Sequence, residues 1–187
     1  MVVSLYIGDI CTAPADVVCT STNPNLDLML GTGGAIREAG GWTIQEECNA
    51  IIEIEHQRTG KRCLMMGSAV LTGAGELPFK GVIHCVAIDP FHDSSVDIIK
   101  ACVRNALKEA AGVATKVETI AMPVFASGHG RFDFEESLKA MTEALGECPD
   151  SAVKRVCIVV RRPPHGVLAQ QHLERWFGPI EVERQAR

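Results

Sequence analysis

The chain has 187 residues, of which 47% are hydrophobic and 22% are charged, as is typical of a globular protein long enough to bury a full core in one domain. A formal net charge of −5 argues against a nucleic-acid-binding protein that neutralises many backbone phosphates. No apolar stretch approaches membrane-spanning length and the N-terminus lacks a signal-peptide pattern, so we expect a cytoplasmic protein without membrane association.

The eight cysteines contain no C-x-x-C pair, and several of them lie in apolar runs. This usage indicates reduced, buried thiols rather than a disulfide framework. No ligand spacing indicates a metal site, and no local pattern sets a cysteine beside a histidine base. We therefore predict no metal, no cofactor and no catalytic cysteine.

The N-terminal third of the chain predicts two strands, at residues 2–7 and 16–22. After the second strand, an Asn-Pro pair stops regular structure, and the glycine cluster at 31–34 opens a short helix. The cluster is not a P-loop, because no Gly-Lys-Ser/Thr follows it. It is not a dinucleotide fingerprint either, since Ile36 stands where the third glycine would be.

The middle of the chain alternates helices and strands. Thr43 and Glu46 form a potential capping box, which predicts a helix from there to about Gly60. Strands are predicted at 68–72 and 81–86, and a long amphipathic helix follows a serine cap.

A second glycine loop lies further along the chain. A buried strand at 119–125 breaks into Ser-Gly-His-Gly at 127–130, and a helix capped by Asp133 follows. Such a loop leaves backbone N–H groups at the positive end of a helix, where a phosphate can bind. Taken alone, it is equally well explained as an ordinary βα loop whose glycines only satisfy turn geometry. Two loops of this kind, however, can hold a diphosphate from both sides.

The C-terminal part predicts a strand at 153–160, a helix at 166–177 and a polar tail at 181–187 that frays. Strands alternating with helices predict an α/β protein, a three-layer α/β/α sandwich with a mixed, largely parallel sheet. Ligands bind such sheets at the carboxyl ends of the strands, where both glycine loops fall. No linker or repeat divides the chain, so we expect one domain over residues 1–187 with its core at about 2–160.

At this point six landmarks, in order, resemble those of the macro domain family, the ADP-ribose-binding (Appr-1"-p processing) module. The resemblance covers about residues 2–160 and implies the macro domain fold. The landmarks are Gly8-Asp9-Ile10; Thr20-Ser21-Thr22-Asn23; Gly31 to Ile36 with Ala39-Gly40-Gly41; Gly67-Ser68-Ala69-Val70 with Leu77-Pro78; Val82-Ile83-His84; and Pro123, Ser127-Gly128 and Phe132.

The resemblance implies roles for individual residues. Asp9 would accept a hydrogen bond from the exocyclic amine of adenine, Asn23 would bond the distal ribose, and Phe132 would lie against that ribose or the phosphate edge. Without the family resemblance, Asp9 would be read as a helix or turn cap, Asn23 as a turn residue and Phe132 as a core residue. His84 is predicted to be a packed strand residue with or without the resemblance. The ligand-binding residues implied are Asp9, Ile10, Asn23, Gly31, Thr32, Gly33, Gly34, Ala35, Ile36, Pro123, Ser127, Gly128, His129, Gly130, Arg131 and Phe132.

The first glycine loop departs from that of hydrolytic macro domains. They carry an aspartate where this chain has Gly33, often a histidine where it has Arg37, and an asparagine where it has Thr20. A water-orienting carboxylate is therefore missing from its usual place. The pattern is closer to binding-only members, which predicts binding of ADP-ribose or of a mono-ADP-ribosylated protein.

An enzymatic function is the alternative to binding alone. The alternative is an ADP-ribosyl or O-acetyl-ADP-ribose hydrolase acting in the same cleft, with His129 as the candidate acid or base. We expect little hydrolysis, because Asp27 and Asp133 only flank the two loops. A third alternative, recognition of poly(A) RNA, is disfavoured by the acidic charge balance.

Overall fold

The computed structural model describes residues 1–149 and 151–185. Strands and helices alternate along these residues. The strands are β1 (Val2–Ile7), β2 (Val17–Thr22), β3 (Ala69–Thr72), β4 (Val82–Val86), β5 (Thr119–Pro123), β6 (Arg155–Val160) and β7 (Glu181–Arg184). The helices are η1 (Ile10–Thr12, a 3-10 turn), α1 (Gly31–Gly40), α2 (Thr43–Thr59), α3 (Val96–Ala111), α4 (Phe134–Gly146) and α5 (Pro163–Phe177).

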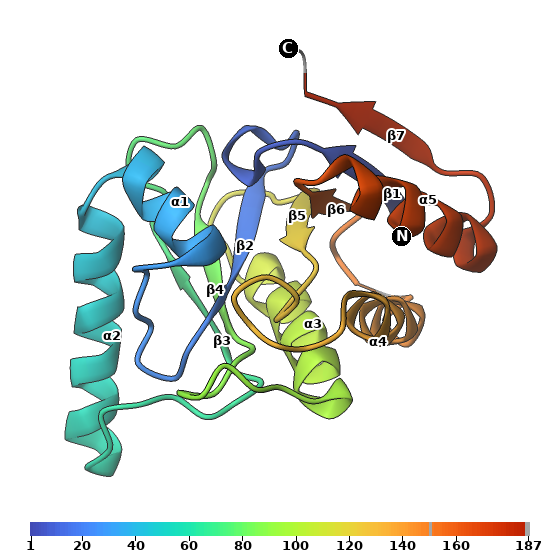
Figure 1. Cartoon of the computed structure of the whole chain (residues 1–187). Coiled ribbons are helices and arrows are strands. Elements are labelled where there is room, and N and C mark those ends of the chain that lie inside the picture. Colours follow the sequence, from blue (N-terminus) through green and yellow to red (C-terminus); the bar gives the residue numbers. More distant parts are fainter. Residues whose placement is uncertain (150, 186–187) are drawn as a thin grey trace.

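Within the described residues, the strands form one seven-stranded sheet in the order β3-β4-β2-β5-β6-β1-β7. Only β3 and β4 pair antiparallel; the other neighbours are parallel. Helices α1 and α2 cover one face of the sheet, and α3, α4 and α5 cover the other (Figure 1). The predicted three-layer α/β/α sandwich with a mixed, largely parallel sheet is confirmed.

The sheet separates two hydrophobic cores. Along β2, Val17 and Cys19 pack with α3 and α4 in one core, whereas Val18 packs with α1 and α2 in the other. All three residues are fully buried. A strand covered on both faces is apolar at successive positions, which explains why these strands are continuous hydrophobic runs in the sequence.

Some predicted helix boundaries are wrong. The capping box does not form, because Thr43 is already the first residue of α2 and Trp42 occupies the cap position without a side-chain hydrogen bond. Helix α5 begins at Pro163 rather than at Gly166, since proline suits the first turn of a helix, where its missing N–H is not needed. Asp133 caps α4 as predicted.

The C-terminal tail does not fray over residues 181–184. These residues form β7, which pairs in parallel with β1 from Ser4↔Glu181 to Ile7↔Arg184. An edge strand is stabilised by backbone hydrogen bonds and tolerates charged side chains. The polar residues of β7 therefore lack the apolar pattern by which a strand is predicted from sequence. Residues 186–187 of the predicted tail lie outside the described residues. Among the described helices, none combines the length and apolar character needed to cross a membrane.

Candidate functional site

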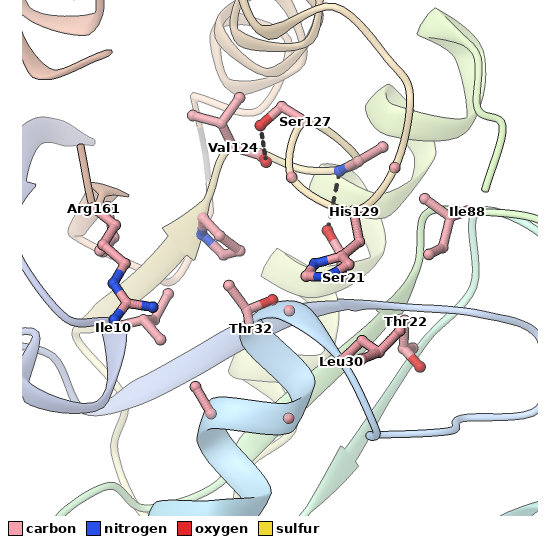
Figure 2. A pocket seen from close by; sticks show the side chains of 18 of the residues that line it. Ile10, Ser21, Thr22, Leu30, Thr32, Ile88, Val124, Ser127, His129 and Arg161 are labelled. Atoms are coloured by element: carbon pink, nitrogen blue, oxygen red, sulfur yellow. Dashed lines mark hydrogen bonds between the residues drawn. The ribbon is translucent and has the colours of Figure 1, made fainter. Parts of the chain in front are cut away.

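A cleft of about 880 Å³ lies at the carboxyl ends of the central parallel strands. Its wall contains one predicted segment after each of three strands: Asp9 follows β1, Asn23 follows β2, and Ser127 follows β5. Arg161, directly after β6, also borders it (Figure 2). The cleft therefore occupies the sheet edge at which ligands of open α/β proteins bind.

Most of the predicted ligand-binding residues border this cleft, and four do not. Those that border it are Asp9, Ile10, Asn23, Gly31, Thr32, Gly34, Ala35, Pro123, Ser127, Gly128, His129 and Gly130.

The four predicted residues that do not line the cleft make contacts within the protein instead. Gly33 faces Leu28, since a Cβ there would lie 3.1 Å from the Leu28 Cδ2 atom. Ile36 is fully buried in the core under α1 and α2. The backbone N–H of Arg131 donates to a loop carbonyl at 2.9 Å, and the partly buried Phe132 packs against the core on the opposite face of the sheet.

The first glycine loop presents the uncapped N-terminus of α1 to the cleft. Gly31 begins the helix with φ of +63°, a left-handed conformation that favours glycine. Leu30 occupies the cap position and provides no side-chain hydrogen bond, so no side chain occupies the first-turn N–H groups. The Thr32 hydroxyl lies 2.9 Å from the Thr20 hydroxyl, which ties this first turn to β2. Free N–H groups at a helix N-terminus suit an anion.

The second glycine loop contacts the first. The backbone N–H of Ala126, which has φ of +57°, donates to Ser21 Oγ at 3.1 Å, and Ser127 Oγ donates to the Val124 carbonyl at 2.8 Å (Figure 2). The His129 ring packs over Gly31, because a Cβ on Gly31 would lie 3.3 Å from His129 Nδ1. The two loops are thus held together across the end of β2.

Asp9 and Asn23 each stabilise a local turn with one oxygen. Asp9 Oδ1 accepts from the Cys11 N–H at 2.9 Å, and Asn23 Oδ1 accepts from the N–H groups of Asn25 and Asp27, both at 3.1 Å. The remaining polar atoms, Asp9 Oδ2 and Asn23 Nδ2, have no hydrogen-bond partner within the described residues. The capping role and a ligand role are therefore compatible for both side chains.

Four further titratable residues that sequence patterns did not single out border the cleft. They are Glu38, Arg161, Arg162 and His165. Asp27, predicted to flank the first loop, also borders the cleft, so the acidic groups on the wall are Asp9, Asp27 and Glu38. Helical spacing could have found Glu38, which is seven residues after the first glycine of α1. The two arginines directly follow β6, so the tendency of ligands to bind at the carboxyl ends of parallel strands could have indicated them.

An aromatic pair also belongs to this wall. The rings of Phe134 and His165 stack with centroids 4.2 Å apart and an interplanar angle of 23°. Phe134 thus borders the cleft two residues after the predicted Phe132, because the chain turns into α4 between them.

Burial shifts the pKa of two titratable side chains, His84 and Cys11, in the direction that favours their neutral forms. Burial lowers the pKa of His84 to about 3, and its Nε2 atom lies 2.8 Å from the Thr72 hydroxyl. His84 is thus a packed strand residue, as predicted. Burial, followed by the charge of Asp9, raises the pKa of the Cys11 thiol to about 12. In the part of the chain that is described, no group of three or more His, Cys, Asp and Glu side chains is arranged to hold a metal ion.

Comparisons with known proteins agree with this architecture. The chain is 36% identical over 127 residues to the O-acetyl-ADP-ribose deacetylase of Enterobacter cloacae, covering 65% of this chain and 64% of that protein. It is 28% identical over 145 residues to the mouse (Mus musculus) protein mono-ADP-ribosyltransferase PARP9, covering 76% of this chain but only 16% of the relative.

Among solved structures, the fold is similar to a mutant of the Oceanobacillus iheyensis macrodomain determined with ADPR. The TM-score is 0.80 at 22% sequence identity, and the alignment covers 91% of each chain. The macro domain family model matches residues 19–141, which include both glycine loops, the strands β3, β4 and β5 and most of β2. The chain therefore belongs to the macro domain family.

Proposed function

We propose that this chain binds ADP-ribose, either free or as a mono-ADP-ribosyl group on a protein, in the cleft at the carboxyl edge of the sheet. The observation that carries the proposal is the contact between the two glycine loops beyond neighbouring strands: the His129 ring packs over Gly31, and the Ala126 N–H of the second loop donates to Ser21 Oγ of β2. Both loops border one continuous cleft.

The proposed ligand lies along the strand ends. The diphosphate takes the position between the two loops, where the first turn of α1 and the backbone of residues 126–130 surround it. Adenine lies beyond the end of β1, where Asp9 Oδ2 accepts from its exocyclic amine. The distal ribose lies beside Asn23, whose Nδ2 group donates to a hydroxyl.

Calorimetry with ligand fragments tests this arrangement. ADP-ribose is expected to bind more tightly than AMP or ribose 5-phosphate, because only the complete ligand reaches both loops and the adenine position. Comparable affinities for AMP and ADP-ribose would contradict a diphosphate site formed by two loops. Ligand-induced thermal stabilisation provides an independent readout, since a ligand that binds only the folded state raises the unfolding temperature.

The second candidate function is hydrolysis of an ADP-ribosyl or O-acetyl-ADP-ribosyl bond in the same cleft. Two observations favour it. Asp27 and His129 both border the cleft, and the Asp27 N–H donates to Asn23 Oδ1 at the proposed distal-ribose position. In addition, one relative is an O-acetyl-ADP-ribose deacetylase. Against it, Gly33 stands where hydrolytic members carry an aspartate, and it faces the core side of the loop. Binding without rapid turnover therefore remains the leading proposal.

Turnover assays separate the two candidates. Mono-ADP-ribosylated protein and O-acetyl-ADP-ribose are incubated with the wild type, Asp27→Asn and His129→Ala, and released ADP-ribose is quantified. Little release by the wild type is the expected result. Robust release that is lost in Asp27→Asn would establish a hydrolase with a displaced carboxylate. Release that survives both substitutions would indicate that bound phosphate and backbone groups position the water.

A further inference from the structure

Two adjacent arginines border the cleft without a carboxylate partner. Arg161 and Arg162 directly follow β6, and both side chains are exposed. Within residues 1–149 and 151–185, neither forms a salt bridge or a side-chain hydrogen bond. Asp9 and Glu38 also border the cleft, but neither is ion-paired with an arginine. Two unpaired guanidinium groups on one wall are notable in a chain whose net charge is −5.

The order of the strands places this pair along the proposed ligand. At the carboxyl edge the order is β2, β5, β6 and β1, and neighbouring strands are about 4.8 Å apart. The proposed diphosphate site lies at the ends of β2 and β5, and the proposed adenine site lies at the end of β1. The intervening strand end is that of β6, which carries the two arginines.

Backbone pairing brings the arginine pair beside the start of the adenine site. Ile7 is in register with Val160, and the Gly8 N–H donates to the Val160 carbonyl at 3.0 Å. Arg161 and Ile10 both line the cleft and are labelled in Figure 2. A ligand that joins the diphosphate to adenine has its adenosine ribose at this position.

We propose that Arg161 and Arg162 bind a phosphoryl group on the adenosine ribose, so that the preferred ligands are ADP-ribose derivatives phosphorylated at the 2′ or 3′ hydroxyl. This inference rests on the proposed function. Ribose hydroxyls are satisfied by neutral hydrogen-bonding groups, whereas a phosphomonoester with a charge near −2 matches two planar guanidinium groups. Arginine near the adenosine ribose accommodates a 2′-phosphate in an unrelated nucleotide-binding fold for the same reason.

The test compares two ligands that differ by one phosphoryl group. Wild-type protein is titrated calorimetrically with ADP-ribose and with ADP-ribose 2′-phosphate, and about tenfold tighter binding of the second is expected at moderate salt. In the double variant Arg161→Ala/Arg162→Ala the affinity ratio falls close to one. Arg175→Ala, which removes an exposed arginine of α5 that does not border the cleft, retains the wild-type ratio. Raising the ionic strength reduces the ratio, because exposed charges are screened.

Two further comparisons identify the position and the geometry. Adenosine 2′,5′-bisphosphate and adenosine 3′,5′-bisphosphate, each compared with AMP, show which hydroxyl carries the recognised group. The variant Arg161→Lys/Arg162→Lys retains both charges without the planar forks, and an intermediate ratio is expected. Because all these side chains are exposed, thermal unfolding close to that of the wild type verifies that each variant is folded.

The outcomes separate this inference from the proposed function. Equal affinities for ADP-ribose and its 2′- and 3′-phosphorylated forms would overturn the inference and leave the proposed function intact. A phosphate preference that persists in the double alanine variant would overturn the role of the arginines. Tighter binding of an oligoadenylate than of either bisphosphate would assign the arginines to a polynucleotide instead. Absence of ADP-ribose binding by the wild type would refute the proposed function itself.

Discussion

Asp9 caps a turn and has a proposed role in adenine recognition, and a single substitution can separate the two. Its Oδ1 atom caps η1 through the Cys11 N–H at 2.9 Å, while Oδ2 is free for the proposed contact with adenine. Asp9→Ala removes both functions at once, so a loss of affinity could follow from a disturbed turn. Asp9→Asn keeps an oxygen for the cap and replaces the second oxygen by an NH₂ donor, which cannot accept from the adenine amine.

The expected magnitudes differ for stability and for binding. Asparagine caps about as well as aspartate, so the free energy of unfolding of Asp9→Asn should stay within about 0.5 kcal/mol of the wild type. Loss of a charge-assisted hydrogen bond should weaken ADP-ribose binding by about 1–3 kcal/mol. This corresponds to roughly a 5- to 150-fold increase in Kd. Urea denaturation and calorimetry measure the two quantities on the same preparation.

A ligand analogue makes the test of Asp9 reciprocal. Hypoxanthine carries a carbonyl oxygen where adenine carries its amine, so the NH₂ group of Asp9→Asn can donate to it. The variant should therefore lose, or reverse, the wild-type preference for ADP-ribose over its hypoxanthine counterpart. Unchanged affinity of Asp9→Asn for ADP-ribose, together with an unchanged base preference, would refute adenine recognition by Asp9 and leave it as a cap alone.

Two further predictions concern the loop and the sheet that support the cleft. Gly130→Ala should lower both ADP-ribose affinity and the melting temperature, at a cost of about 1–3 kcal/mol, because a Cβ there would collide with a main-chain carbonyl of the same loop. Gly128→Ala, whose Cβ meets no protein atom within 4 Å, should leave the melting temperature close to that of the wild type. Burial by itself would raise the pKa of Asp16, but its 2.7 Å ion pair with Lys80 and the N–H and hydroxyl donors of Thr119 hold that pKa below its ordinary value of 3.8. The stability that Asp16 contributes is therefore present above its ordinary pKa and is lost as the pH falls below it. Asp16→Ala should lower the free energy of unfolding by about 1–3 kcal/mol at pH 7 and by less at pH 2. An equal loss at both pH values, measured by urea denaturation, would contradict this.

Much of the fold was predictable because it depends on local patterns. The buried strands are short apolar runs, the long helices have one apolar face, and Asp133 caps its helix through a hydrogen bond three residues along the chain. The glycine loops are recognisable because a strand end, a glycine and a helix start are adjacent in sequence. The predictions failed where local signals were ambiguous, as at Thr43, whose side chain could have capped a helix but lies inside it.

The strand β7 and the composition of the cleft depend on contacts between distant segments. Residues 181–184 are polar and predict a frayed tail, yet the open edge of β1 provides backbone partners for them. Gln185 then accepts a hydrogen bond from the Asp9 N–H at 2.8 Å, across a separation in sequence that no local pattern records.

The sequence by itself determined the α/β class, the two glycine loops and the family resemblance, because each of these follows from short segments with fixed spacing. Only the tertiary structure decided which side chains share the cleft. It removed Phe132 and Gly33 from the lining and added Glu38 and the arginine pair led by Arg161. The physical reason is that strand pairing decides which strands are adjacent in a parallel sheet. The loops that meet at the carboxyl edge are therefore determined by pairing between distant segments rather than by their order along the chain.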